Sequence, residues 1–597
     1  MLRGTGASTF PEILTAEESY GTLAHLQQSE KVVLLNVFAI VVSQVAWDNI
    51  DRAWAKTVVG QVCGYLGLDD LTFNAVKPLL EVDAKEVNIS AEAFLSAMST
   101  DRESACFANF VSGTLNIIIQ SEEGYDSRMR QALILFCNET SVSFSIFLDK
   151  EARVSAALET VASANSHAVN NKTAEGRTSS SKLWKSAAIA SGAVFGSAAL
   201  IFTGGLAAPA VAAGFTAQGN GAVVGGTTAA IGGFLVSSGG TLALTTLFGV
   251  SGAGLGGYKM KKRLGDLKSF EFRAPSLYPD GNSESEESSD GGGMESISSR
   301  HSSLTLTVLI NGWAYPEESS DEGEANGVEN GSTSKHDETS TKSFLGDGDV
   351  ALSSQKEREK HFRAYTGPSN DSFILDFELD DLSELQDSVK GFLTKELLTY
   401  AGTAVLQKTV LASLMTSLAL PSYIIKAADM VDNPYSIASS KARQAGGLLA
   451  NILLEREAGN RPVKLIGFSL GAIALFECLR HLVEAGEKGR GIVQEAIFLG
   501  APIPNTESTW ALCRTVVPGR IVNCFSPKDF LLKLLSRGTF QAHYPAGMSR
   551  TTPEQERKFR IENLDVDEFI KGSHSKYAIV WSDILSNLVG SDEDMKC

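Results

Sequence analysis

The chain has 597 residues, 43% of them hydrophobic, and a formal net charge of −18 at pH 7. This length predicts about two or three domains, each able to bury a core. The acidic balance argues against nucleic acid as a partner, because phosphate contacts need clustered Lys and Arg. Seven cysteines with no Cys-x-x-Cys pair indicate a reducing compartment. The first residues lack the apolar core of a cleavable secretory signal.

The N-terminal region, Ala16–Ala168, is predicted to be a mostly helical domain. Apolar residues recur at spacings of three and four in Leu34–Trp47 and in Ala132–Phe147. The stretch Val32–Trp47 is apolar enough to resemble a membrane span, but it is short and polar residues interrupt it. A core helix is therefore the better interpretation. The region carries no metal-ligand cluster or phosphate-binding loop, and we expect it to serve in packing or interaction.

No residue between Ser186 and Tyr258 is charged. One membrane-spanning helix needs about 20 apolar residues, so the run has length for two. The polar segment Gln218–Gly221 divides it into Ala187–Phe215 and Ala222–Val250. The pattern predicts a transmembrane hairpin over residues 186–258.

Basic residues flank both ends of this run: Lys182, Lys185, Lys259, Lys261, Lys262 and Arg263. The positive-inside rule then places both flanks in the cytosol, which requires an even number of crossings. We expect a multi-pass endomembrane protein whose partners include membrane lipids. Because glycine and alanine contribute little transfer energy, a hairpin that enters one leaflet and a buried soluble hairpin remain alternatives.

Two tracts of low complexity follow the hairpin. Residues 278–303 (Tyr278–Ser303) form a Ser-, Glu- and Gly-rich linker, and Glu317–Glu359 is acidic and poor in apolar residues. Such compositions cannot bury enough surface to offset the entropy of ordering. The acidic tracts are spacers or docking segments for trafficking proteins.

The apolar stretch Ser388–Ala428 precedes the segment Gly467–Gly471 and is compatible with helix. In lipases a comparable insertion forms a mobile lid. Periodicity alone does not separate a lid from a core helix pair here.

The pentapeptide Gly467–Gly471 reads Gly-Phe-Ser-Leu-Gly and lies between a predicted strand, Val463–Ile466, and a predicted helix, Ala472–Val483. That context is typical of a nucleophile elbow, in which a sharp strand-to-helix turn exposes the serine hydroxyl. Gly467 and Gly471 leave room for the chain to double back. Ser469 is the predicted nucleophile, and the alternative is a glycine-rich turn with an incidental serine.

A serine nucleophile needs an acid and a base that follow it in the chain. Beyond a buried strand, Glu495–Leu499, comes a second strand, Arg520–Phe525, and Asp529 lies just past its end. Sites in α/β sheets form outside the carboxyl ends of strands, so Asp529 is the predicted acid. The alternative is an Asp that caps the helix Phe530–Leu535.

Three histidines follow Ser469: His481, His543 and His574. His481 lies on the helix after the serine, roughly three turns away, and points along the rod. His543 lies in a predicted loop and remains an alternative candidate for the base. His574 follows the last predicted strand, Ile561–Val566, and precedes a helix, Tyr577–Leu588, so it is the predicted base.

An oxyanion hole needs two backbone N–H groups aimed at the developing charge. Leu470, the residue after the nucleophile, supplies the first. The early strand Leu304–Ile310 is followed by Asn311-Gly312-Trp313, and Gly312 or Trp313 is the candidate for the second. A simple turn is the alternative.

These segments resemble the family of transmembrane and coiled-coil domain-containing protein four. The likeness rests on VKLIGFSLGA from Val463, the strand that ends in INGW, Asp432–Tyr435 before an alanine-rich helix, and the SPKD and GSHSKY segments. It covers roughly Lys182–Leu588. It implies an α/β-hydrolase-like domain behind a membrane segment and a Ser-Asp-His triad on Ser469, Asp529 and His574. One departure is Phe377, where the family's pattern suggests tryptophan.

Together the patterns predict an α/β protein: a helical domain at residues 16–168, the hairpin, and an α/β-hydrolase-like domain at 304–590 with an acidic insertion at 317–359. The expected function is that of a membrane-anchored serine hydrolase acting on a lipid or another acyl ester, with no metal and no organic cofactor. The alternative is a membrane adaptor or tether that kept the fold without the chemistry. A pore is disfavoured, because no charged stripe lines the apolar run.

Overall fold

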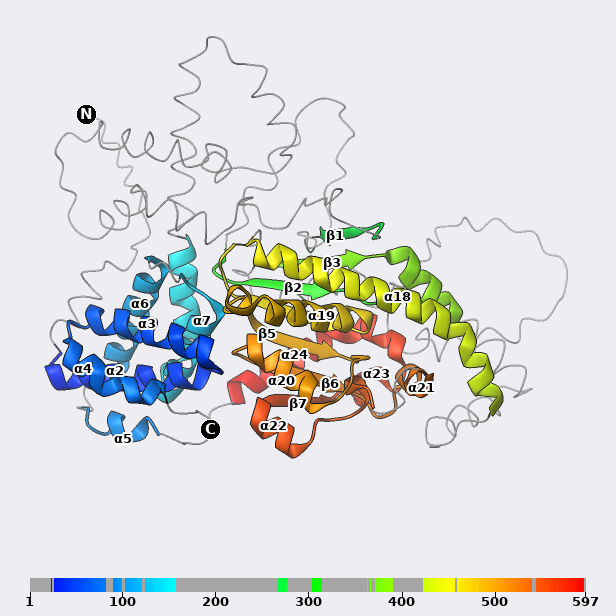
Figure 1. The fold of residues 1–597 in the computed structure, drawn as a ribbon. Helices are drawn as coiled ribbons and strands as arrows, with labels where there is room; N and C mark the ends of the chain where they lie inside the picture. The colour runs from blue at the N-terminus through cyan, green and yellow to red at the C-terminus, as the bar shows by residue number, and fades with distance from the viewer. Residues whose placement is uncertain are drawn as a thin grey trace, which may run out of the picture.

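The structure is a computed structural model. It describes residues 23, 26–81, 90–98, 103–120, 124–156, 267–273, 275, 303–313, 362, 365–366, 371–389, 422–456, 459–538 and 544–594. Two hydrophobic cores form in this part of the chain, one mainly among the N-terminal helices and one around a β-sheet (Figure 1). The predicted hairpin, the acidic insertion and most of the predicted lid stretch lie outside the described residues.

The N-terminal unit is helical. Its elements are α2 (Gln28–Val45), α3 (Asn49–Tyr65), α4 (Asp70–Val76), η1 (Lys77–Leu80), α5 (Glu92–Leu95), α6 (Glu103–Gln120) and α7 (Ser127–Glu139). Aspartates start two of the longer helices: Asp48 accepts from the N–H groups of α3, and Asp126 accepts from the Met129 N–H in α7. Each such cap stabilises its helix by about 1 kcal/mol.

Helix α2 lies in the core of this unit, as predicted for Val32–Trp47. Within the described residues it is the one helix long and apolar enough to cross a membrane. However, Phe38 is fully buried and packs edge-on against Phe110 of α6, with ring centroids 5.8 Å apart. Phe110 in turn contacts Phe136 of α7 at 4.7 Å. The apolar composition of α2 is explained by helix packing.

The periodic stretch Ala132–Phe147 is two helices. Helix α7 ends at Glu139, Ser141 has φ 55°, and a further helix occupies residues 144–156. A left-handed residue ends a helix, and Thr140 Oγ adds a bond to the Phe136 carbonyl at 2.7 Å. Apolar spacing could not reveal this break, because apolar residues recur on both sides of it.

The second core surrounds a seven-stranded sheet in the order β1-β3-β2-β4-β5-β6-β7. The strands are β1 (Phe270–Arg273), β2 (Leu306–Ile310), β3 (Asp371–Phe377), β4 (Val463–Phe468), β5 (Val493–Leu499), β6 (Ile521–Phe525) and β7 (Ile561–Asp565). All neighbours pair in parallel except β1, which pairs antiparallel with β3. The predicted α/β class is confirmed. Strands β2, β5 and β6 are buried at every position, which fits a sheet covered on both faces.

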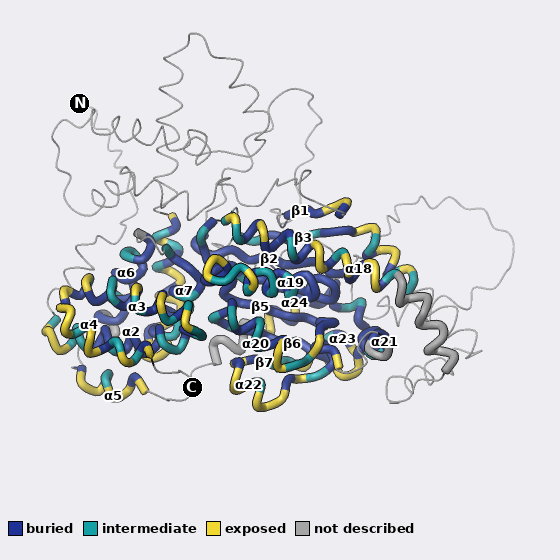
Figure 2. The backbone as a smooth tube through the Cα atoms, in the orientation of Figure 1, coloured by how far each residue is buried: buried dark blue, intermediate teal, exposed yellow. Residues whose placement is uncertain are grey.

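Helices lie on both sides of the sheet (Figures 1 and 2). They are α18 (Ser422–Leu454), α19 (Leu470–Glu484), η2 (Gly486–Gly489), α20 (Glu507–Val516), α21 (Phe530–Gly538), η3 (Ala546–Met548), α22 (Pro553–Phe559), α23 (Asp567–Ile570), η4 (His574–Lys576) and α24 (Tyr577–Asp594). Helices α18, α19 and α20 pack side by side on one face, and α24 lies on the other. From β2 the chain first forms β3 on one side of β2 and then crosses over to form β4 on its other side. The strand order therefore reverses between β2 and β4, which makes this place a topological switch point.

Two features of this unit differ from the sequence prediction. Strand β1 precedes residue 304, where the sheet was expected to begin, because a four-residue edge strand gives little pattern of its own. The segment Asp432–Tyr435 was expected before a helix, but it lies inside α18, with Pro434 within the helix. Proline usually interrupts a helix, yet α18 continues through Pro434.

The helical unit packs against the amino ends of the strands, whereas α21 and α23 lie at the carboxyl ends (Figure 1). The Arg130 side chain of α7 donates to Gln494 of β5 at 2.8 Å and to both carboxylate oxygens of Glu151. Tyr125 donates its hydroxyl to the same Glu151. These four side chains are buried, so the two units share one polar network.

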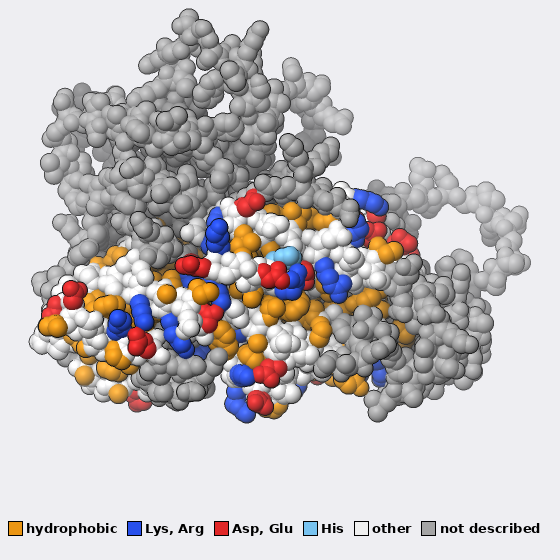
Figure 3. Space-filling model, in the orientation of Figure 1, with side chains coloured by type: hydrophobic (Ala, Val, Ile, Leu, Met, Phe, Trp, Pro, Cys, Tyr) orange, Lys and Arg blue, Asp and Glu red, His pale blue; other side chains and the backbone are white. Residues whose placement is uncertain are grey.

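Charged groups on the described surface are interspersed by sign (Figure 3). Exposed pairs such as Lys558–Glu507 and Arg153–Asp149 are of this kind. Such exposed pairs contribute little to stability, because solvent and salt screen their charges. The two hydrophobic cores and the buried network therefore account for most of the stability.

Candidate active site

Ser469 lies between β4 and α19 with φ 54° and ψ −123°. A non-glycine residue rarely adopts positive φ, and such strain persists only where the surroundings enforce it. Here the Ser469 N–H donates to the Leu499 carbonyl of β5 at 3.0 Å, which ties the turn to the neighbouring strand. The side chain is therefore presented at the carboxyl end of β4, beside the switch point.

His574 and Asp529 come to Ser469 from two other loops. His574 Nε2 lies 2.7 Å from Ser469 Oγ, and His574 Nδ1 lies 2.6 Å from Asp529 Oδ2. All three residues are buried, with Ser469 only 3% exposed. The structure thus brings the three predicted residues into one hydrogen-bonded series.

The direction of these bonds follows from the donors available. An ionised carboxylate only accepts hydrogen bonds, so Nδ1 carries the imidazole proton and donates a hydrogen bond to Asp529. Nε2 is then the acceptor, and Ser469 Oγ–H donates to it. Asp529 also accepts from the Leu532 N–H through Oδ1 at 3.0 Å, so it caps α21 as well. The cap that was the alternative interpretation of Asp529 is therefore present together with its contact to His574.

Two aromatic rings enclose the imidazole. Trp313 and Tyr577 lie edge-on to His574, with ring centroids 5.6 and 5.4 Å away. Burial raises the pKa of the Tyr577 hydroxyl well above its usual value, and the nearby Asp529 charge raises it further. Tyr577 therefore stays neutral and adds an apolar wall to the site.

The loop after β2 passes directly over the turn at Ser469. A Cβ added to Gly312 would lie 2.0 Å from both the Gly471 nitrogen and the Phe468 oxygen. A Cβ added to Gly471 would lie 2.1 Å from the Ile310 oxygen, and one on Gly467 would lie 2.6 Å from the Gly471 oxygen. These glycines are required because the two backbones touch.

We expect Gly312→Ala to lower the free energy of unfolding by about 1–3 kcal/mol, because the new methyl group overpacks a contact between two backbones. Gly64→Ala is the matched control, since a Cβ at that exposed position of α3 meets nothing within 4 Å. Thermal denaturation of the purified full chain compares the two. If the two variants melt at the same temperature, the loop after β2 can move enough to accommodate the added methyl group.

Backbone N–H groups at this loop differ in their availability. Trp313 N–H donates to Asn311 Oδ1 at 3.2 Å, whereas within the described residues Gly312 N–H has no acceptor. Leu470 is the first residue of α19, so its N–H has no acceptor within the helix. A Cβ on Gly312 would lie 2.7 Å from Leu470 N, so the two N–H groups are neighbours.

Asn311 holds the loop in place, a role that the sequence analysis missed. Its side chain is fully buried and donates from Nδ2 to Asp376 Oδ1 of β3 at 2.8 Å. Asp376 also accepts from Arg273 of β1 at 3.2 Å. The position of Asn311 at the carboxyl end of a buried strand was a signal, but its partners lie on strands far away in the sequence.

The other histidines do not join the series. His481 of α19 lies on the surface beside Glu477 and Glu484, at 3.7 and 3.5 Å. His543 lies outside the described residues. In the described part of the chain, no group of three His, Cys, Asp or Glu side chains could hold a metal ion.

The comparisons with known proteins agree on a membrane-protein family. The chain is 28% identical over 534 residues to Transmembrane and coiled-coil domain-containing protein STS1 of Oryza sativa subsp. japonica, covering 88% of this chain and 68% of the relative. It is 28% identical over 572 residues to Uncharacterized membrane protein F35D11.3 of Caenorhabditis elegans, covering 95% and 80%. The resemblance inferred from the motifs is therefore confirmed at the level of the family.

A third relative is named Probable lipase MIL1, of Saccharomyces cerevisiae. It is 28% identical over 344 residues, which is 58% of this chain and 26% of the relative. No solved structure matches. The model of the family described as Protein of unknown function (DUF726) matches residues 181–289 and 339–590, more than half of the chain, and the chain belongs to that family.

Proposed function

We propose that this chain is a membrane-anchored serine hydrolase that cleaves esters through a Ser-Asp-His triad. The observation that carries the proposal is the hydrogen-bonded series of Ser469, His574 and Asp529. The strained backbone of Ser469 at a strand-to-helix turn supports its role as the nucleophile of an elbow. The similarity to a yeast protein named as a probable lipase favours the same class of reaction.

In the proposed reaction, Ser469 Oγ attacks the ester carbonyl carbon while His574 Nε2 takes its proton. Asp529 keeps the imidazole in the required tautomer and stabilises the imidazolium. Collapse of the tetrahedral intermediate breaks the ester bond, and the leaving alcohol takes the proton from Nε2. Water, activated by the same nitrogen, then hydrolyses the acyl-serine and regenerates the enzyme.

The negative charge of the tetrahedral intermediate needs two N–H donors. Leu470 and Gly312 are the proposed pair, because their N–H groups are neighbours and unoccupied. Trp313 was the other candidate, and its N–H must first leave Asn311 Oδ1. We therefore assign the second donor to Gly312.

The proposed substrate is a lipid or another acyl ester at a membrane. The uncharged run Ser186–Tyr258, proposed to be a hairpin with cytosolic flanks, would hold the site close to the bilayer. Relatives named as membrane proteins support this location. The reaction requires no metal or organic cofactor, because the triad and the N–H groups supply every proton transfer and charge contact.

Labelling by a fluorophosphonate tests the proposal. The probe forms a covalent bond with an activated serine, and a short alkyl chain suits a serine that is 3% exposed. We expect the purified wild type to be labelled and Ser469→Ala and His574→Ala to lose labelling. Ser575→Ala is the matched control, a serine of the His574 loop outside the series, and should label like wild type.

The opposite result has a definite meaning. If folded wild type does not label, in detergent or with added membranes, the hydrolase proposal fails. The chain would then be an adaptor or tether that keeps the fold without the chemistry.

A further inference from the structure

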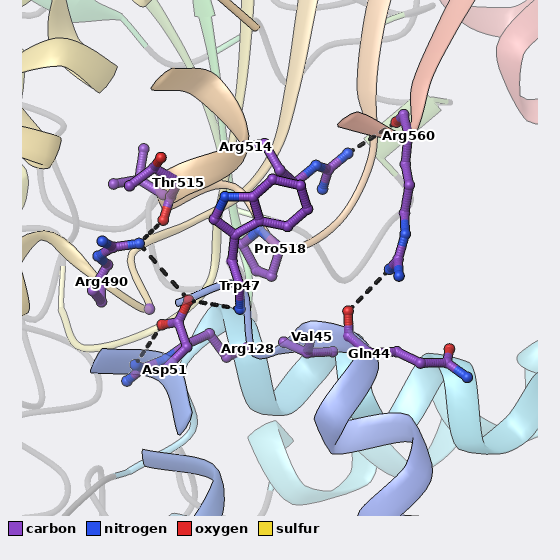
Figure 4. A pocket seen from close by; sticks show the side chains of 12 residues that line it. Gln44, Val45, Trp47, Asp51, Arg128, Arg490, Arg514, Thr515, Pro518 and Arg560 are labelled. Atoms are coloured by element: carbon purple, nitrogen blue, oxygen red, sulfur yellow. Dashed lines mark hydrogen bonds and ion pairs between the residues drawn. The ribbon is translucent and has the colours of Figure 1, made fainter. Parts of the chain in front are cut away.

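A hollow lies at the junction of the helical unit and the sheet, at the opposite end of the strands from Ser469 (Figure 4). It opens to solvent. The end of α2, Trp47, the start of α3 and Arg128 of α7 form one wall, and the end of α20 and the segments that lead into β5, β6 and β7 form the other. Trp47 crosses the junction and packs against Phe559, with ring centroids 6.2 Å apart.

The lining is strongly basic. It contains Arg128, Arg490, Arg514 and Arg560 but a single carboxylate, Asp51. Two of the four arginines are neutralised. Arg128 pairs with Asp126 and Asp51 at 2.6 and 3.2 Å, and Arg490 pairs with Asp48 and, at 3.7 Å, with Asp51.

Arg514 and Arg560 have no carboxylate partner within the described residues. Arg514 is 4% exposed and donates to the carbonyl oxygens of Phe559, Val517, Gly519 and Arg560 at 2.6–2.9 Å. Arg560 donates to the Gln44 carbonyl at 3.0 Å. Carbonyl oxygens satisfy hydrogen bonds but do not cancel a charge.

The charge of Glu562 offsets that of Arg514 only in part, because Glu562 is paired with Arg520. Within the described residues, the buried positive charge of Arg514 therefore has no carboxylate in direct contact with it. Burial, together with the charge of nearby Arg560, lowers the pKa of Arg514 to about 9. Buried charges in proteins are normally paired, because an unpaired ion in a region of low dielectric is costly. An anion in the hollow would supply the missing pairing.

The hollow also offers free donors. A guanidinium has five N–H groups, and the four bonds of Arg514 leave one Nη2 N–H. Arg490 is buried, and its Nε has no acceptor although both of its Nη atoms are bonded. Arg560 is exposed and uses one donor of its fork. Arginine forks match the geometry of phosphate oxygens.

We propose that this hollow, lined by Arg490, Arg514 and Arg560, is a binding site for a phosphate-bearing anion. The anion bridges the helical unit and the sheet. Asp51 repels the anion in part, but Arg128 and Arg490 hold that carboxylate at one wall. The site is separate from the proposed triad and does not depend on it.

Equilibrium dialysis of the purified full chain with radiolabelled inorganic phosphate tests the proposal. We expect about one phosphate per chain and a melting temperature that rises with phosphate, since a ligand that binds only the folded state stabilises it. Arg560→Gln should bind at least about tenfold more weakly, because a charge-assisted fork is lost. Arg557→Gln, on the same helix α22 but away from the hollow, is the matched control.

Three outcomes separate the alternatives. Binding of phosphate to wild type and to Arg557→Gln, but not to Arg560→Gln, supports the site. If glycerol phosphate or phosphatidic acid vesicles displace the labelled phosphate better than unlabelled phosphate does, the natural ligand is a lipid headgroup. Equal binding by both variants overturns the proposal. A melting temperature that rises as much in chloride of matched ionic strength also overturns it, because general screening would then explain the effect.

Discussion

Asp529→Asn is expected to slow ester hydrolysis by about 10⁴-fold while the chain remains folded. An asparagine at this position presents an N–H group to His574 Nδ1, which then loses its proton and acts as an acceptor. The proton moves to Nε2, and Nε2 can no longer take the proton of Ser469 Oγ. The measurement is kcat on a soluble short-chain ester.

Asparagine is the suitable replacement because Asp529 has a structural role as well. Its Oδ1 caps α21 by accepting the Leu532 N–H, and an asparagine oxygen can still accept that bond. Asp567→Asn is the matched control: Asp567 accepts from Ser526 and Lys528 nearby but does not contact His574. Similar kcat values for the two variants would contradict the role of Asp529 in a triad.

The placement of the three site residues was predictable because the sheet is parallel. Ser469, Asp529 and His574 each follow a strand in the sequence, and the carboxyl ends of parallel strands lie along one edge. The strand boundaries differ by at most two residues from those predicted, and the order of strands and loops is retained. A motif in the right strand-to-helix context therefore carried most of the information about the site.

The residues that hold the loop after β2 in place were not predictable in the same way. Asn311 depends on Asp376, and Asp376 contacts Arg273 on an antiparallel edge strand. Those partners become neighbours only after the sheet is assembled, and no local pattern encodes that pairing. The break at Ser141 and the helix that runs through Pro434 escaped for a related reason, since tertiary packing overrides local propensity.

The junction between the two units was also invisible in the sequence. The basic residues of the hollow come from both units, and Asp48 and Arg490 meet across it. The proposed triad and the hollow lie at opposite ends of the same strands. An anion at the junction would therefore act on the site only through the sheet or through the packing of the helical unit.

We expect Arg130→Met to lower the free energy of unfolding by about 3–5 kcal/mol, because it leaves the buried Glu151 carboxylate without its counter-ion. Gln494 also loses its donor, so the contact between α7 and β5 weakens. The measurement is a urea titration of the purified full chain by circular dichroism, with hydrogen exchange to locate the opening. Arg153→Met, which removes an exposed pair with Asp149, should change stability by less than about 0.5 kcal/mol.

A second substitution distinguishes an uncompensated charge from simple loss of packing. In Arg130→Met with Glu151→Leu, no buried charge of this pair remains, so most of the lost stability should return. If the double variant is as unstable as the single one, the cost arises from the shape of the arginine, from its bond to Gln494 or from the buried Tyr125 hydroxyl that loses Glu151 as its acceptor. In that case the network serves to position α7 against β5, and hydrogen exchange should quicken at both elements together.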